Sequence, residues 1–145
     1  IKFHKEIDEI ELKNMESNYD ILSIKKMKNK EFLIENGIDV DHGLELLGDM
    51  EMYDETLNDF LDESCERLPR LEKSKNECDL ANYAIDAHAM KSDSKYLGFT
   101  KLAQLSLEHE MAGKEKNTDF INQNYNTLIE EANRIIKVVK EYLGK

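Results

Sequence analysis

Apolar residues recur at alternating intervals of three and four positions along four long segments of this chain. That spacing keeps them on one face of an α-helix and is typical of helices that pack side by side in a bundle. A single proline, together with abundant Glu, Lys and Leu, also favours helix over strand. The four series, which include a few small or polar members, are Met50, Tyr53, Leu57, Phe60, Ser64, Leu68 and Leu71; Leu80, Tyr83, Ala87, Met90, Ser94 and Leu97; Leu102, Leu105, His109 and Ala112; and Ile121, Tyr125, Leu128, Ala132, Ile135, Val139 and Tyr142.

The connections between these four segments are short, and short connections force consecutive helices to run antiparallel. The sequence therefore predicts an all-α fold, an antiparallel up-down-up-down four-helix bundle. Pro69 lies inside the first segment and predicts either a kink or a division of that helix near Leu68. The expected helix boundaries are, in chain order, Asp79 or Cys78, Gly98, Gly113, and Asn117 or Thr118.

A shorter helix is expected just before the bundle. Asn36 and Gly37 form a typical turn pair. Residues 38–48 then carry a helical pattern in which Leu44 and Leu47 face inward. This pattern predicts a short leading helix that packs against the bundle.

The first part of the chain has a different composition. Residues 1–30 are rich in Lys and Glu and show only a loose helical pattern, which predicts a linker or an N-terminal helical arm. Residues 31–145 are then the bundle domain. Because the chain begins with Ile1 rather than Met, we expect it to be a piece of a longer protein.

The charge of the chain limits its partners. Its formal net charge of -11 disfavours nucleic acid, which requires basic patches, and disfavours an anionic membrane surface. No apolar run approaches the roughly 20 residues that span a bilayer, so we expect no direct membrane contact. Cys65 and Cys78 form no CxxC pair, and reduced thiols in the cytoplasm are the expectation.

Motifs for metal binding and for autonomous catalysis are absent from the sequence. No histidine has a Glu three residues before it, as metal-binding helical bundles require. His109 and Glu110 begin a run that resembles the zinc motif HExxH, but Gly113 occupies the position of the second histidine. No phosphate-binding glycine loop and no GxSxG motif occurs. We therefore expect no metal, no cofactor and no nucleotide site in this domain.

His88 is the candidate reactive residue. It points about 140° away from the centre of the buried face of its helix and is therefore expected to be exposed. Lys91, Ser92 and Lys95 follow at intervals of three, four and seven and lie beside it. A neutral imidazole is a nucleophile near pH 7, and nearby lysines would offset the charge of a phosphoryl group. The spacing alone also fits an ordinary solvent-facing helix.

The residues around His88 resemble a known family signature. The run from Ala87 to Gly98 reads Ala-His-Ala-Met-Lys-Ser, then Asp-Ser-Lys-Tyr, then Leu-Gly. It is similar to the pattern of the histidine-containing phosphotransfer (HPt) domain, which reads Ala-His-x-Leu-Lys-Gly, a few small or polar residues, and Leu-Gly. The resemblance extends over about residues 33–143, including Leu68 followed by Pro69.

This resemblance implies a function as an intermediate in a phosphorelay. His88 would accept a phosphoryl group on Nε2 from a receiver-domain aspartate and transfer it to the aspartate of another receiver. The receiver would supply Mg²⁺. Residues 31–145 would be the last module of a hybrid sensor histidine kinase, joined through residues 1–30, and the kinase in the same chain is then a further expected partner. A separate phosphotransfer protein is the alternative parent. The resemblance also assigns supporting roles to Lys91, which offsets charge, to Glu110, which hydrogen-bonds the ring, and to Lys114, which adds positive charge. The alternative is a bundle that binds a receiver or kinase as an adaptor, without phosphorylation.

Two positions depart from the family pattern. Ser92 stands where the family has Gly, and it would either crowd the receiver slightly or hydrogen-bond the phosphoryl group. His109 occupies a buried position that is normally apolar, either as a satisfied buried histidine or as a pH-sensitive packing defect. The residues expected either to form a partly apolar docking surface around His88 or simply to cover the core are Ile38, Val40, Leu44, Leu47, Met52 and Ile85.

Overall fold

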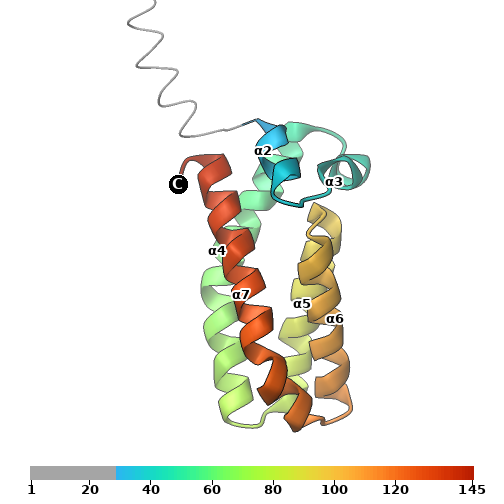
Figure 1. Ribbon diagram of the computed structural model, residues 1–145, viewed down its shortest axis with the longest axis vertical. Helices are drawn as coiled ribbons and strands as arrows, with labels where there is room; N and C mark the ends of the chain where they lie inside the picture. Colours follow the sequence, from blue (N-terminus) through green and yellow to red (C-terminus); the bar gives the residue numbers. More distant parts are fainter. Residues whose placement is uncertain (1–28) are drawn as a thin grey trace, which may run out of the picture.

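The computed structural model describes residues 29–145, and the predicted arm or linker of residues 1–30 lies almost wholly outside this range. The described part of the chain consists of helices joined by short loops (Figure 1). The all-α prediction is therefore confirmed for these residues. In chain order the helices are α2 (Lys30–Glu35), α3 (Val40–Leu47), α4 (Met50–Asn76), α5 (Leu80–Leu97), α6 (Thr100–Lys114) and α7 (Thr118–Leu143).

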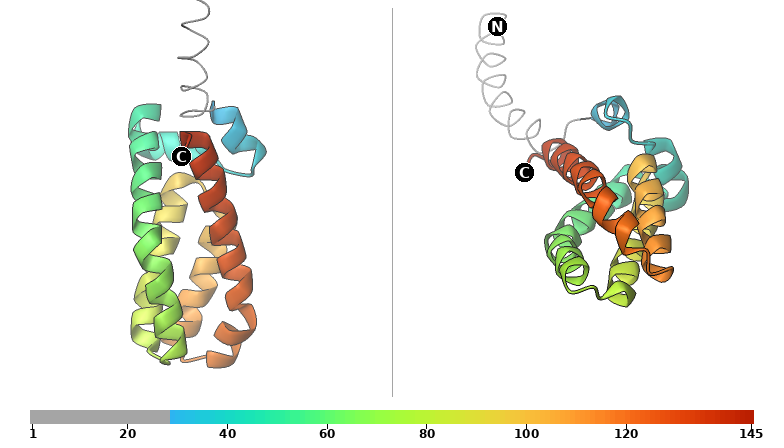
Figure 2. Two further views of the ribbon diagram at one scale, coloured as in Figure 1. Left: turned by 90° about the vertical axis from the view of Figure 1, so that its left-hand side faces the viewer. Right: turned by 60° about the horizontal axis from the view of Figure 1, so that its bottom comes forward.

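The four long helices form an antiparallel bundle. Helix α4 packs on α5 and α7, and α6 packs on the same two helices, so the four close into a ring. Figure 2 shows α4 beside α7 and α5 beside α6 along the length of the bundle. The residues predicted to face inward fill its interior. The largest fully buried side chains of the long helices are Tyr53, Leu57, Leu71, Tyr83, Leu97, Leu102, Ile121, Leu128, Ile135 and Tyr142.

Several helix boundaries follow the chemistry of capping residues. The side chains of Asp79 and Asn117 accept hydrogen bonds from the backbone N–H three residues later, and so each caps the start of its helix. Gly98 ends α5 in the left-handed conformation, with φ +83°. Pro69 lies within α4 but does not divide it, because α4 is helical on both sides of the proline.

The prediction that Gly113 ends the third long helix was wrong. Helix α6 continues to Lys114, and Gly113 is buried inside it against α5. A Cβ atom at this position would lie 3.1 Å from the Cβ of Ala84 and 3.2 Å from the carbonyl oxygen of Leu80. Gly113 therefore allows α5 and α6 to approach closely, and its role is in packing rather than in helix termination.

The leading segment packs across one end of the bundle (Figure 1). Asp39 donates its backbone N–H to the carbonyl of Gly98, at 2.9 Å, which ties this segment to the end of α5. Arg134 of α7 donates to the carbonyl of Asn36, at 2.8 Å. Helix α3 begins at Val40, within the predicted residues 38–48. The sequence did not predict α2 as a separate helix.

The burial of the leading segment decides between the two roles that the sequence left open for its apolar residues. Ile38 and Val40 are fully buried in the core, so they are not available to a partner. Leu44 and Leu47 of α3 are partly buried and pack against the same core. The segment thus covers the end of the bundle, and this packing is favourable because it removes apolar side chains from water.

Within residues 29–145, none of the helices combines the length and the apolar character that a membrane-crossing segment needs.

Candidate functional site

His88 lies in the middle of α5 and faces outward, as its position relative to the buried face predicted. Its side chain is 57% exposed, whereas Ala87 beside it is fully buried. Helix α5 is held on both sides, by α4 and by α6. The ring is therefore an accessible group on a rigid support, which suits a nucleophile that must meet a large partner.

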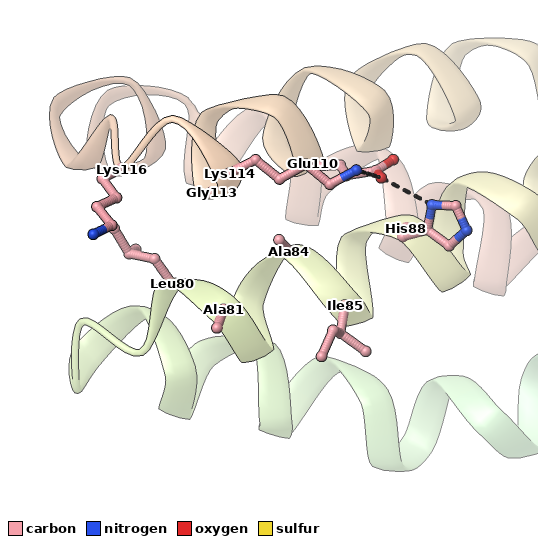
Figure 3. A pocket seen from close by; sticks show the side chains of 9 residues that line it. All are labelled: Leu80, Ala81, Ala84, Ile85, His88, Glu110, Gly113, Lys114 and Lys116. Carbon is pink, nitrogen blue, oxygen red and sulfur yellow. Dashed lines mark hydrogen bonds and ion pairs between the residues drawn. The ribbon is translucent and has the colours of Figure 1, made fainter.

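Glu110 of α6 organises the groups around His88. Its carboxylate is 3% exposed, and its Oε2 atom lies 2.8 Å from Nδ1 of His88 (Figure 3). The same oxygen lies 2.8 Å from Nζ of Lys114, and Oε1 lies 2.7 Å from Nζ of Lys91. One buried carboxylate thus binds the ring and two lysines at once.

These contacts keep Glu110 ionised. Burial alone would raise the pKa of its carboxyl group, but the hydrogen bonds from Lys114, Lys91 and His88 outweigh burial and lower the pKa to about 2. An ionised carboxylate only accepts hydrogen bonds, so Nδ1 of His88 must be the donor. In the neutral ring the other nitrogen, Nε2, then carries no proton and keeps its lone pair.

The predicted supporting residues divide into two groups. Lys91 and Lys114 join His88 through Glu110, although Lys91 is only 15% exposed and Lys114 is 65% exposed. Ser92, one turn after His88, is partly exposed. Lys95 is not part of this cluster, because it lines a separate hollow at the end of the bundle that holds α3.

A groove beside His88 was not foreseen from the sequence. It runs between α5 and α6 from His88 to the loop that follows α6 (Figure 3) and has a volume of about 540 Å³. Ala84 and Gly113 carry little or no side chain, which leaves this space open between the two helices. We call it the α5/α6 groove, and its lining residues are Leu80, Ala81, Ala84, Ile85, His88, Glu110, Gly113, Lys114 and Lys116.

His109 is a buried member of the core rather than part of the reactive cluster. Its Nδ1 atom lies 2.7 Å from the hydroxyl of Tyr83, and Phe120 packs edge-on against its ring. Burial lowers the pKa of His109 and so favours the neutral ring. The satisfied buried histidine is borne out for Nδ1 alone, because Nε2 is also buried but forms no hydrogen bond within residues 29–145.

Among residues 29–145, no group of three or more His, Cys, Asp and Glu side chains is arranged to hold a metal ion.

Comparison with known proteins identifies the family. No curated protein and no solved structure matches this chain. The sequence profile of the Hpt domain matches residues 55–137, which is more than half of the chain and includes His88 and its lysines. The chain therefore belongs to the Hpt domain family, whose members carry out histidine phosphotransfer in phosphorelay signalling and interact with receiver domains.

Proposed function

We propose that His88 accepts a phosphoryl group from the aspartyl phosphate of a receiver domain and transfers it to an aspartate of another receiver. The observation that carries this proposal is the hydrogen bond between Nδ1 of His88 and the ionised Glu110. That bond turns the unprotonated Nε2 into the atom available for reaction, on a ring that is exposed in the middle of a rigid helix.

The transfer balances without a separate base. The Nε2 lone pair attacks phosphorus, and the bond between phosphorus and the aspartyl oxygen breaks, so that its electron pair leaves with the carboxylate. No proton has to leave the ring, because Nε2 carries none. The ring becomes more positive as the N–P bond forms, and Glu110 stabilises that charge through Nδ1. The second transfer runs the same step in reverse, onto the aspartate of the other receiver.

We expect the two lysines bound to Glu110 to offset the charge of the phosphoryl group in different ways. Lys114 is largely exposed on a flexible side chain, so it can turn toward a group on Nε2. Lys91 is more enclosed and keeps Glu110 ionised from the other oxygen. We expect the remaining charge to be offset by Mg²⁺ bound to the acidic residues of the receiver, so that this domain needs no cofactor of its own.

The proposal is tested by transfer of radioactive phosphate from a phosphorylated receiver. We expect label on the chain that is stable in base and labile in acid, as a phosphorus–nitrogen bond to histidine is. His88→Gln should abolish the label. His42→Gln is the matched control, because His42 is also exposed but lies on α3, and it should leave the label unchanged.

Two results would contradict the phosphoacceptor role. Label that persists in His88→Gln would place the phosphate elsewhere. Tight binding of a phosphorylated receiver with no label at all would instead support the alternative, an adaptor that works without phosphorylation.

A further inference from the structure

Two neighbouring residues of α6 each form a hydrogen bond to α5. Oε2 of Glu110 lies 2.8 Å from Nδ1 of His88, and Nδ1 of His109 lies 2.7 Å from the hydroxyl of Tyr83. The first pair belongs to the reactive cluster, on the outside of the bundle. The second pair lies inside the bundle, where Tyr83 and His109 are both buried. The proposed phosphotransfer uses the first pair and leaves the second unexplained.

The two bonds lie on opposite sides of the contact between the helices. Tyr83 and His88 are about 140° apart around the axis of α5. His109 and Glu110 are about 100° apart around the axis of α6. A rotation of α6 would carry both of its residues the same way, and it would therefore lengthen at least one of the two bonds.

Between these two bonds the helices are in close contact. Figure 3 shows Gly113 of α6 opposite Ala84 of α5, where an added Cβ atom would lie 3.1 Å from the Cβ of Ala84. The close contact sets the distance between the helices, and the buried bond on one side of it limits rotation. Together they leave Glu110 on the side where it meets His88.

The buried pair depends on a neutral His109 ring. Tyr83 of α5 and Phe120 of α7 contact the ring. Burial lowers the pKa of His109, and the nearby backbone of Asn124 on α7 offsets this effect only in part. Burial raises the pKa of the Tyr83 hydroxyl, so this partner also stays neutral near pH 7.

The charged side chains in this part of the bundle have other partners. On α4, Lys75 lies over the ring of Tyr125, and Glu72 acts on the hydroxyl of the same tyrosine, whose pKa is raised by burial. On α6, Glu110 is bound in the reactive cluster. Within residues 29–145 no charged group shifts the pKa of His109. A proton on this ring would therefore leave an unpaired charge in the core.

A proton would also change the hydrogen bond between His109 and Tyr83. In a neutral ring Nδ1 can accept the O–H of Tyr83, whereas both nitrogens of a protonated ring are donors. The hydroxyl would then have to turn its own proton away. Nε2, which is buried without a hydrogen-bond partner, would need an acceptor as well. Both changes favour a state in which the ring has left the core.

We propose that Tyr83 and a neutral His109 position Glu110 against His88, and that a proton on His109 releases α6 from this arrangement. Neither residue touches the reacting atoms, so both are positioning residues. Their effect on phosphotransfer rests on the proposed function. The positioning itself does not, because the ring of His88 reports it without any phosphate.

The first test reads the proton of the His88 ring in the full chain at pH 7.5. Spectra of ¹⁵N-labelled histidine show which ring nitrogen carries it, and the contact with Glu110 places it on Nδ1. In Tyr83→Phe, which removes only the hydroxyl, and in His109→Leu we expect the share of His88 rings protonated on Nδ1 to fall about twofold. His109→Asn should restore this share, because its amide oxygen can still accept a hydrogen bond near the position of Nδ1.

The second test measures phosphorylation by phosphoramidate, a small donor that releases ammonia. At pH 7.5 we expect the labelling of His88 to be about threefold slower in Tyr83→Phe and in His109→Leu, and unchanged in His109→Asn. The double variant with both Phe and Leu should be no slower than either single variant, because the two residues act as one unit.

The third test follows urea unfolding between pH 7.5 and 5.5. In the unfolded chain His109 takes up a proton near its ordinary pKa of 6.5, but in the folded chain its pKa is lower. Its contribution to stability is therefore complete above about pH 6.5 and is lost as the pH falls below that value. Over this range the equilibrium constant for unfolding should rise about tenfold more in the unaltered chain than in His109→Asn. His42→Gln, which removes an exposed histidine of α3, should keep the full rise.

Each result decides one part of the proposal. A His88 ring that is unchanged in both Tyr83→Phe and His109→Leu would overturn the positioning role. An equally large rise in His109→Asn and in the unaltered chain would overturn the role of the proton. If His109→Leu does not fold, Tyr83→Phe still decides the first question and His109→Asn the second. Shifted His88 rings in a chain that takes no label from phosphoramidate or from any receiver would uphold the positioning and overturn the phosphoacceptor role.

Discussion

Nδ1 of His88 and Oε2 of Glu110 lie 2.8 Å apart, and this contact leads to a spectroscopic prediction. Because Glu110 accepts the proton of Nδ1, the neutral ring should be the tautomer protonated on Nδ1, whereas a solvent-exposed histidine side chain prefers the proton on Nε2. Long-range ¹H–¹⁵N spectra of labelled histidine report which nitrogen carries the proton. In Glu110→Ala we expect His88 to return to the common tautomer and phosphotransfer to slow by roughly tenfold or more.

An unchanged tautomer in Glu110→Ala would show that Glu110 does not orient the ring. Rescue by Glu110→Gln is a useful contrast, because a Gln oxygen still accepts the Nδ1 proton but carries no charge. If Gln restores the tautomer and not the rate, the charge of Glu110 matters for the reaction itself. If Gln restores both, orientation of the ring is sufficient.

The low pKa of Glu110 also predicts how stability depends on pH. In the unfolded chain this carboxyl group takes up a proton near its ordinary pKa of 4.5, but in the folded chain it does so only near 2. Its contribution to the free energy of unfolding is therefore complete above about pH 4.5 and is lost as the pH falls toward 2. Urea unfolding at pH 6, 5, 4 and 3 should show a smaller loss in Glu110→Gln than in the unaltered chain.

Glu108→Gln serves as the control for that measurement, because Glu108 lies on the same helix and outside the lysine cluster. It should unfold with nearly the pH dependence of the unaltered chain. An equally flattened dependence in both variants would mean that general charge on α6, rather than the contacts of Glu110, sets the acid response.

At the scale of residues, the sequence predicted an outward-facing His88 beside Lys91, and it predicted that Glu110 meets the ring. Helical spacing was sufficient for the first, because angles along one helix are fixed by its geometry. Which residues meet between two helices depends on how the helices are shifted along each other, and the spacing within one helix does not report that shift. The prediction that Glu110 meets His88 therefore came from the family resemblance. For the same reason the sequence grouped Lys95 with His88, although it lines a separate hollow, and it left open whether Ile38 covers the core.

Among the elements, the junction between α5 and the leading segment depends on Gly98. Its φ of +83° is unfavourable for other residues, and a Cβ there would lie 2.1 Å from the carbonyl oxygen of Asp39. Gly48 has a similar φ of +96° but open space around it. We therefore expect Gly48→Ala to cost about 1–2 kcal/mol of stability from backbone strain alone. Gly98→Ala should cost a further 1–3 kcal/mol or more, because the backbone must move.

Thermal or urea unfolding of the two alanine variants measures this difference directly. Equal losses in both variants would mean that only the backbone conformation of Gly98 matters and that its contact with Asp39 is easily relaxed. The sequence correctly predicted that Gly98 ends α5. It gave no sign of the approach by Asp39, because residues so far apart in the chain meet only after the bundle has formed.

Gly113 and His109 show where helix patterns mislead. A glycine near the end of an apolar series suggests a helix end, and this suggestion was wrong because α6 uses Gly113 to approach α5. A histidine in an apolar series left a satisfied ring and a packing defect open, and only the structure shows that the hydroxyl of Tyr83 pairs with its Nδ1 atom. Both residues are explained by the neighbouring helix, which a pattern within one helix does not describe.

For the whole molecule, the position of the domain boundary is a prediction that truncation can test. A chain that begins at Asn29 retains every contact of the described residues, so it should unfold with nearly the stability of the full chain. A chain that begins at Asp39 lacks Leu33 and Ile38, both buried in the core, and should lose several kcal/mol. Urea unfolding compares the three chains.

A large loss in the chain that begins at Asn29 would show that the predicted linker of residues 1–30 belongs to the folded domain. The all-helical bundle itself followed from the sequence, because four long apolar series and short connections allow few other arrangements. The hybrid sensor kinase parent and the location in the cytoplasm stay predictions, since a bundle of this family fits more than one parent protein.

The sharing of one buried carboxylate by two lysines has a consequence for the direction of phosphate flow. One carboxylate offsets only one of the two lysine charges, so Glu110, Lys91 and Lys114 together keep one positive charge before a phosphoryl group reaches His88. An arriving phosphoryl group, with roughly two negative charges, competes with Glu110 for these cations and is only partly offset by them. We therefore expect the domain to hold the group loosely enough to pass it on in either direction. The supply of phosphorylated receiver on one side, and its consumption on the other, would then decide which way the signal moves.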